Sequence, residues 1–482
     1  MPWRYFLIAV LFAASHATAQ SLPDLGDVAQ SEFSPLQERR LGERIMREIR
    51  ADRSFNDDAE ATDYITTLGE RLVARSPDSR QSFDFFLIQD NQINAFALPG
   101  GFIGVNTGLL LSAQSESEVA SVLAHEIAHV TQRHIARMIA GQKASQLTSL
   151  AALAIAILAA RSSSQAAEAA AAFGTATAIQ TQLNFTREHE READRVGVQI
   201  LQEAGFDPHA MASFFERLQR ATRVYEGGAP SYLRTHPLTF ERIADVQNRV
   251  ENLPYRQIPD SLGFQLVRAK LRAESQPPYE AMAWFQQSLA ERKFLSEIAS
   301  RYGLALSMLR GGDHAKAAKE LAAARKLAPE PSPVLETLDC RIRAASRQTE
   351  KAFACYREAL KTYPNYRALT YDYANALLEN GRAGEALKLV EARLQVYTED
   401  YKLYLLQARS YAMLNRRLAQ HRAQGEAYAR MGNIPAAVEQ LQIAVKTGDG
   451  DFYQLSATEA RLRELRRLND ELRKEAGKPP ER

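Results

Sequence analysis

Hydrophobic positions in the first part of the chain follow two periods. Residues 34–50 and 59–76 repeat apolar side chains at helical spacing, which predicts two amphipathic surface helices. Short aromatic and β-branched runs between 82 and 106, separated by Asn, Asp and Gly-Gly, predict a small antiparallel sheet. A further apolar stretch predicts one helix from 116 to about 140. We therefore expect a mostly helical α+β unit before residue 262.

Two other apolar segments raise the question of membrane contact. Residues 5–14 are apolar and precede Ala17-Thr18-Ala19, which has small residues where a signal peptidase cleaves. We expect residues 1–19 to be a cleaved signal peptide rather than an uncleaved anchor. Residues 148–161 are almost wholly apolar, but shorter than the roughly 20 residues of a membrane-spanning helix. They fit either a buried helix or a segment that contacts a partner or a membrane surface peripherally.

An internal repeat marks the second half of the chain. It is read from pairs of residues 35 positions apart: Ala305 and Cys340, Gly312 and Arg347, Ala317 and Ala352, Pro329 and Pro364. A period near 34, with a small residue where two helices cross and a Gly turn between them, resembles the tetratricopeptide repeat. The resemblance covers roughly 265–447, so we expect an all-α solenoid over 262–482.

The chain contains two cysteines, Cys340 and Cys355. In the repeat framework they lie on the two helices of one pair, so a disulfide between them is geometrically plausible. Two separate buried thiols are the alternative. An oxidising compartment would favour the bridge.

The charge balance excludes one broad class of partner. The 482 residues carry 60 basic and 58 acidic side chains, a formal net charge of +2. A uniform positive field of the kind that binds a nucleic-acid backbone is therefore not expected, and nucleic acid is not a predicted partner. The length allows two or three domains, each with a core of its own.

Candidate metal ligands gather on one apolar stretch, residues 121–138. His125 and His129 are four residues apart, so on a helix they lie about 40° from each other and can direct two imidazoles at one ion. Glu126 lies near the same face. This is the HExxH arrangement, in which two neutral imidazoles bind zinc and the glutamate takes a proton from water. His134 is about 180° from His125 if the helix continues, so we expect it to be structural.

A catalytic zinc site needs a third protein ligand, and residues 190–194, EREAD, offer one. Together with HExxH, this ExxxD pattern resembles the zinc metallopeptidases related to HtpX and the prenyl-protein CAAX proteases. The resemblance implies that Glu190 is the third zinc ligand and that Asp194 holds a ligand histidine in its useful tautomer. The neighbouring polar residues are expected to be solvated: Glu188, His189 and Glu192.

A further match to this family precedes the HExxH stretch. Residues 93–110, INAFALPGGFIGVNTGLL, resemble the strand-turn-strand segment before the zinc helix. An extended substrate is expected along the edge strand near Asn94, Ala95 and Phe96. Backbone hydrogen bonds to this strand would bind it without a strong demand on the substrate's sequence.

A second match follows the ExxxD pattern. Residues 234–243, RTHPLTFERI, resemble the family's His-Pro element. His236 is expected either to stabilise the tetrahedral oxyanion or to occupy the open zinc position in the resting enzyme, and an ordinary loop histidine is a third possibility. Arg242 either orients this element or is a surface charge.

The whole order of signal peptide, zinc protease and repeats resembles the BepA-like family of periplasmic β-barrel assembly-enhancing proteases. The resemblance implies a zincin-type α+β metalloprotease domain over 20–261, one zinc ion, and a repeat domain over 262–482. It also implies a periplasmic endopeptidase that acts on unfolded or misassembled outer-membrane proteins, with the repeats recruiting these clients or the β-barrel assembly machinery. The alternative is mainly a chaperone-like scaffold whose protease stays latent.

Overall fold

The computed structural model describes residues 33–78, 81–140, 186–224, 231–255 and 257–475. The predicted signal peptide and the apolar segment 148–161 lie outside these ranges. The elements of the first part are, in chain order, α2 (Pro35–Ala51), β1 (Phe55–Asn56), α3 (Ala59–Val73), β2 (Asp84–Ile88), β3 (Ala95–Leu98), β4 (Phe102–Asn106), α4 (Thr107–Ser112), α5 (Glu116–Thr131), α6 (His134–Ala140), α10 (Arg187–Glu203), α11 (His209–Val224), α12 (Ser231–Thr235) and α13 (Phe240–Glu251).

The sheet is mixed, so the prediction of an antiparallel sheet was wrong in part. The strand order is β1-β2-β4-β3. The outer pairs, β1 with β2 and β3 with β4, are antiparallel, but β2 and β4 run parallel with Asp84 opposite Phe102. The chain leaves β2, forms β3 at the far edge, and returns through a tight turn as β4. The sequence runs predicted the strands but not this crossing.

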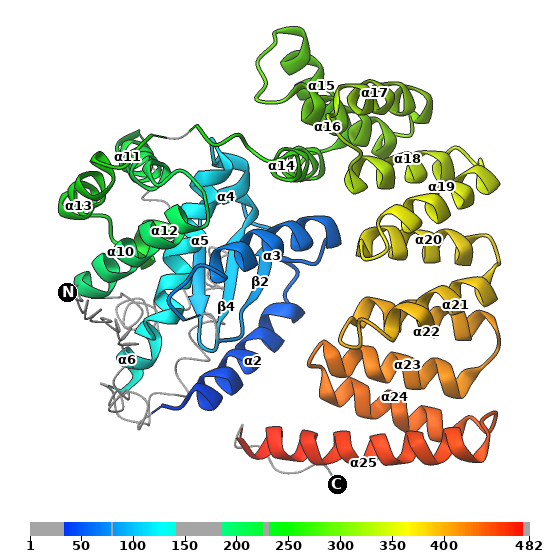
Figure 1. The fold of residues 1–482 in the computed structure, drawn as a ribbon. Coiled ribbons are helices and arrows are strands. Elements are labelled where there is room, and N and C mark those ends of the chain that lie inside the picture. Colours follow the sequence, from blue (N-terminus) through cyan, green and yellow to red (C-terminus); the bar gives the residue numbers. More distant parts are fainter. Residues whose placement is uncertain (1–32, 79–80, 141–185, 225–230, 256, 476–482) are drawn as a thin grey trace, which may run out of the picture.

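Alternating side chains place a helical layer on each face of the sheet. Phe86 and Ile88 belong to the core beneath α2, whereas Phe85 and Leu87 belong to the core shared with α3 and α5. This is the period of two expected of a strand that is covered on both sides. Figure 1 shows the sheet between α2 and α5. In the strand order, β3 is the edge strand next to β4.

The helix predicted from 116 to 140 is broken. α5 ends at Thr131, and Arg133 has a left-handed φ of 53° before α6 begins at His134. No glycine is needed, because the Arg133 side chain is anchored: its guanidinium donates to the Phe33 carbonyl at 2.8 Å and pairs with the Glu38 carboxylate. These long-range contacts offset a backbone conformation that is strained for a residue with a Cβ.

The second part of the chain is an all-helical array that resembles a tetratricopeptide-repeat solenoid. Its helices are α14 (Leu262–Glu274), α15 (Pro278–Ala290), α16 (Glu297–Arg310), α17 (His314–Leu327), α18 (Pro333–Ala345), α19 (Thr349–Thr362), α20 (Arg367–Glu379), α21 (Ala383–Leu394), α22 (Tyr401–Met413), α23 (Arg417–Arg430), α24 (Ile434–Lys446) and α25 (Phe452–Glu475). Cys340 of α18 and Cys355 of α19 are joined in a disulfide.

One repeat of the array was missed in the sequence. The turns between paired helices have a positive φ at Gly312, Arg347, Gly381 and Asn415. Asn415 stands 34 residues after Gly381, so the period continues there with asparagine, a residue that tolerates the left-handed region. The next turn with a positive φ, at Gly432, follows only 17 residues after Asn415. α23 therefore packs against both α22 and α24.

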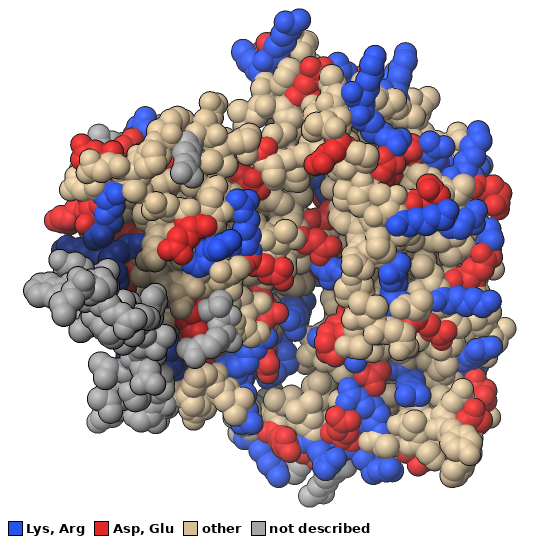
Figure 2. Space-filling model, in the orientation of Figure 1, with Lys and Arg blue, Asp and Glu red and all other residues tan. Residues whose placement is uncertain are grey.

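The array curves around one side of the first part, and α25 at its end passes beneath α2 (Figure 1). Figure 2 shows the surface hollowed between the two parts. A buried ion-pair network joins them. Lys270 of α14 is 1% exposed and lies 2.6 Å from Asp58 and 2.5 Å from Glu60 at the start of α3. Arg367 of α20 pairs with Asp63 of α3.

None of the helices within the described ranges is both long enough and apolar enough to cross a membrane.

Lys270 provides a test of the junction between the two parts. Replacing it with Met leaves the buried Glu60 carboxylate and the partly buried Asp58 carboxylate without their closest cation, so the free energy of unfolding should fall by about 3–5 kcal/mol. The matched control is Lys293→Met, whose side chain is 79% exposed and which should change stability by less than about 0.5 kcal/mol. Urea denaturation measures both. Equal stabilities for the two variants would contradict the assigned role.

Candidate metal centre

Close packing of α10 against α5 brings the candidate ligands together. All residues of α5 are buried, and the core that it shares with α10 includes the small, fully buried side chains of Ala124 and Ala193. A Cβ at Gly197 would lie 3.2 Å from the backbone nitrogen of His125 and 3.3 Å from the carbonyl carbon of Ala124. The glycine therefore lets α10 approach the α5 backbone closely enough for short carboxylate side chains to reach the imidazoles.

Four donor side chains meet in one buried cluster: His125, His129, Glu190 and His236, whose nearest donor atoms all lie within 4.8 Å of one another. His125 Nε2 is 3.0 Å from His129 Nε2 and 3.5 Å from Glu190 Oε2. Glu190 Oε1 is 3.4 Å from His129 Nε2. Each of these side chains is at most about 1% exposed, so three imidazoles and a carboxylate converge in a dry site that could hold a metal ion.

His236 lies inside this cluster. Its Nδ1 is 3.0 Å from Glu190 Oε1 and 3.3 Å from His125 Nε2, and its Nε2 is 3.4 Å from Glu126 Oε1. The ring stacks on Tyr232, with centroids 4.8 Å apart and planes 25° apart. The structure thus places His236 beside both the HExxH glutamate and the ExxxD glutamate, which is not the environment of an ordinary loop histidine.

Arg242 is the cation that balances the carboxylates of α10. It is 2% exposed, so of the two alternatives for this residue the surface charge is excluded. Its Nε and Nη2 each donate to Asp194 at 2.8 Å, and its Nη1 lies 2.6 Å from Glu190 Oε2. Burial would raise the pKa of Glu190, but His236 and Arg242 outweigh it and hold that pKa well below the usual range. Both carboxylates therefore stay ionised.

Asp194 in turn fixes the orientation of one imidazole. Its Oδ1 is 2.9 Å from His125 Nδ1, which leaves His125 Nε2 directed at the cluster. Burial opposes charge on His125, but the hydrogen bonds to Asp194 and Glu190 prevail and raise its pKa to about 9. Without a metal, His125 is therefore protonated at neutral pH.

His134 and its neighbours differ from expectation. His134 is fully buried because α6 turns back at Arg133; its Nδ1 is 2.9 Å from His129 Nδ1 and its Nε2 is 3.1 Å from Glu192 Oε2. Burial lowers its pKa to about 4. His189 stacks on it, with centroids 4.5 Å apart. The prediction that His189 is solvated was wrong, since it is buried against His134. Glu192 contacts His134 but keeps 29% of its side chain exposed, and Glu188 is exposed as predicted.

The segment proposed to bind substrate lies at the edge of the sheet. β3 pairs with β4, placing Ala95 opposite Val105 and Phe96 opposite Gly104, and no other described strand lies on its outer side. Asn94, just before β3, is 3% exposed. The backbone N–H of Tyr232 donates to the Ile93 carbonyl at 3.2 Å, so the helix that precedes His236 is tied to the start of this strand.

Some of the residues that shape the site are not indicated by the sequence motifs. Tyr232 could have been noticed as the residue four positions before His236, the spacing that lets an aromatic ring stack on it across a helical turn. His134 carried a chemical signal, a histidine near HExxH, but its placement depends on a helix break that no local residue indicates. Arg242 was noticed, but its burial depends on tertiary packing.

Comparison with known proteins agrees with this geometry. Residues 59–250 match the model of Peptidase family M48. The chain is 34% identical over 467 residues to the beta-barrel assembly-enhancing protease of Escherichia coli strain K12, covering 96% of this chain and 94% of that protein. It is 32% identical to the protein of the same name from Yersinia pestis, covering 94% and 93%. The mitochondrial metalloendopeptidase OMA1 of Schizosaccharomyces pombe is 32% identical over 46% of this chain and 62% of its own length.

The fold, the buried ligand cluster and the family match define a metalloendopeptidase. More narrowly, the chain belongs to the family of beta-barrel assembly-enhancing proteases within peptidase family M48.

Metal binding should release a proton at neutral pH. A raised pKa means that protonated His125 stabilises the metal-free fold below about pH 6.5, and that this stability is lost as the pH rises through about 9. A metal needs the neutral imidazole, so Zn²⁺ binding at pH 7 should expel close to one proton, falling toward none above pH 9. Calorimetric titration in buffers of different ionisation enthalpy measures this. Zinc binding with no proton release at pH 7 would contradict a ligand role for a protonated His125.

Proposed function

We propose that the chain is a zinc endopeptidase of the periplasm that degrades misassembled proteins and so assists assembly of outer-membrane β-barrel proteins. The observation that carries the catalytic part is the buried convergence of His125, His129 and Glu190 beside Glu126. The names of the relatives support the β-barrel part.

The donor set fits zinc. Ligands at about 2.0–2.1 Å from a tetrahedral zinc ion lie about 3.3 Å from one another. Five contacts among the donor atoms of His125, His129, Glu190 and His236 are 3.0–3.5 Å long and bracket that value, and all four donor atoms lie within 4.8 Å of one another. Imidazole nitrogen and carboxylate oxygen are also the atoms that zinc accepts in catalytic sites. We therefore assign the first three as ligands and Asp194 as the residue that orients His125.

Each remaining side chain has a task in peptide hydrolysis. Bound zinc supplies a Lewis acid that activates water and polarises the scissile carbonyl. Glu126, fully buried next to the ligands, takes the proton of the attacking water and passes it to the leaving amine. Arg242 keeps Glu190 and Asp194 ionised, so that they remain ready to bind and to orient.

His236 is proposed to close the resting site. Its Nδ1 lies about as far from His125 and Glu190 as those two residues lie from each other, which is the spacing of a fourth ligand. Hydrolysis needs that fourth position for a water molecule. Tyr232 connects this histidine to the edge strand through its N–H bond to Ile93. A substrate that adds to β3 at Asn94, Ala95 and Phe96 would therefore bind next to the helix that holds His236 in place.

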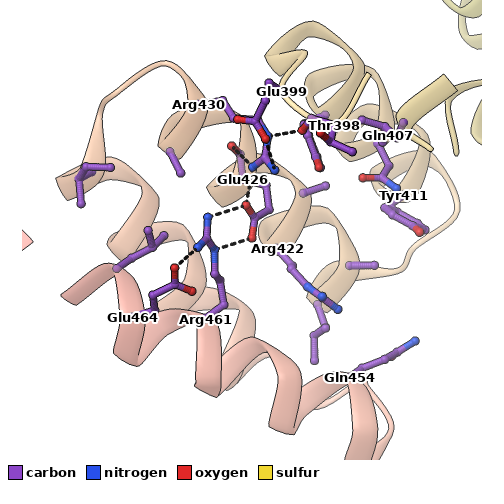
Figure 3. A pocket seen from close by; sticks show the side chains of 18 of the residues that line it. Thr398, Glu399, Gln407, Tyr411, Arg422, Glu426, Arg430, Gln454, Arg461 and Glu464 are labelled. Atoms are coloured by element: carbon purple, nitrogen blue, oxygen red, sulfur yellow. Dashed lines mark hydrogen bonds and ion pairs between the residues drawn. The ribbon is translucent and has the colours of Figure 1, made fainter. Parts of the chain in front are cut away.

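The array is proposed to recruit clients or the β-barrel assembly machinery. A groove of about 930 Å³ is formed by α22, α23 and α25. Figure 3 shows side chains that line it. Its wall is held by a chain of ion pairs in which Glu426 bridges Arg430 and Arg461. Tyr411 and Arg422 also line it, and tyrosine and arginine are the side chains that most often anchor protein partners.

The proposed domains and location follow from the same observations. Residues 20–261 would form the protease domain and 262–482 the repeat domain, which agrees with the family match over 59–250 and the start of α14 at Leu262. The signal-like residues 1–19 support export to the periplasm, and peripheral membrane contact through 148–161 remains part of the proposal. The complete ligand set favours a working enzyme over a scaffold alone.

Glu126→Gln tests the proposed base. The amide keeps the shape of the side chain but cannot take a proton, so cleavage of an unfolded substrate such as casein should fall by about 10²–10⁴-fold while one zinc ion per chain stays bound. Peptide release and metal content measure the two effects. Full activity in the zinc-loaded variant would show that Glu126 is not the base.

His236→Ala separates a closing role from an oxyanion role. If His236 closes the site, kcat/KM for casein should rise several-fold, because the fourth position is open in every molecule. If it stabilises the oxyanion instead, kcat should fall by about 10²–10³-fold. His421→Ala, on α23 of the array, is the matched control and should leave activity unchanged. A loss of activity in His236→Ala alone would overturn the closing role.

A further inference from the structure

The two histidines of the HExxH motif are oriented by different means. His125 Nδ1 meets the Asp194 carboxylate directly, at 2.9 Å. His129 Nδ1 meets another imidazole, that of His134, also at 2.9 Å between the two Nδ1 atoms. This contact is short enough for a hydrogen bond, and both rings are fully buried. One of the two nitrogens must therefore donate and the other accept.

The direction of this bond follows from ligand chemistry. An imidazole that binds a metal through Nε2 keeps its proton on Nδ1, so His129 Nδ1 is the donor and His134 Nδ1 the acceptor. A neutral His134 then carries its own proton on Nε2. That nitrogen lies 3.1 Å from Glu192 Oε2, a carboxylate that can accept it. In this row of hydrogen bonds, from His129 through His134 to Glu192, each donor thus has a matching acceptor.

The Glu192 end of this row of hydrogen bonds is fixed by the charge of Arg137. Arg137 Nη1 lies 2.9 Å from Glu192 Oε2, the same oxygen that faces His134. His134 and Arg137 both come from α6, which reaches Glu192 because the chain reverses direction at Arg133. His189 covers the other side of the His134 ring, with planes 20° apart. The helix break therefore presents one imidazole to two specific partners in a fixed orientation.

We propose that His134 is a positioning residue for the metal: it relays the Glu192 carboxylate to His129 and thereby holds His129 with Nε2 free to bind zinc. The proposal rests on the ligand role of His129 in the proposed function. It also gives each acidic residue of the EREAD stretch a separate task at the metal centre. Glu190 binds, Asp194 orients His125 directly, and Glu192 orients His129 through His134.

Zinc affinity of the full chain, measured by competition with a chromophoric chelator, tests the proposal independently of catalysis. His134→Phe keeps a ring but removes both nitrogens, and should weaken zinc binding by about 10–100-fold. His134→Asn should recover affinity to within a few-fold of the wild type, because its amide oxygen can accept from His129 Nδ1. A ring that served only to fill space would give the opposite order, with Phe better than Asn.

A second pair of variants keeps the test valid if His134→Phe does not fold. Glu192→Ala should weaken zinc binding at least about threefold, whereas Glu188→Ala, an exposed carboxylate on the same helix, should not change it. Zinc affinities unchanged in Glu192→Ala and in every folded His134 variant would overturn the relay. The proposed function would instead be overturned if the wild type bound no zinc, or if the His129→Ala variant bound zinc with the affinity of the wild type.

Discussion

The close approach of α10 to α5 is the contact on which the rest of the site depends. Gly197 removes the side chain that would otherwise crowd the α5 backbone, and the buried Ala124 and Ala193 belong to the core that the two helices share. Only at this distance can Glu190 and Asp194 both reach His125. The same packing excludes water, so the carboxylates need compensation, and without it they would take up protons instead of binding a cation.

Arg242 supplies that compensation and links the site to the helix before His236. Its guanidinium contacts both carboxylates and also donates to the Pro237 carbonyl at 2.9 Å, next to His236. If His236 closes the site as proposed, one side chain holds both the ligands and this histidine. In that proposal, substrate binding at the sheet edge is coupled to opening of the site, because Tyr232 stacks on His236 and its N–H donates to the Ile93 carbonyl.

Much of this architecture could be predicted from local patterns. The spacings of His125, His129, Glu190 and Asp194 specify helical faces, and helical periodicity located α2 and α3 within a few residues. The rest depends on distant contacts. Arg133 adopts a left-handed conformation because Glu38 and Phe33 hold it, so the break that turns His134 toward His129 has no local signal. The parallel pairing of β2 with β4 likewise follows from where β3 lies, and Asn415 replaced the glycine by which the repeat was counted.

Zinc K-edge X-ray absorption of the resting, zinc-loaded chain can count the ligands around the metal. We expect three imidazoles and one carboxylate oxygen, with zinc–nitrogen distances of about 2.0–2.1 Å. In His236→Ala, one imidazole should be lost and a light oxygen ligand gained in its place. A wild-type spectrum that fits only two imidazoles, unchanged in His236→Ala, would contradict both the ligand cluster and the role of His236 within it.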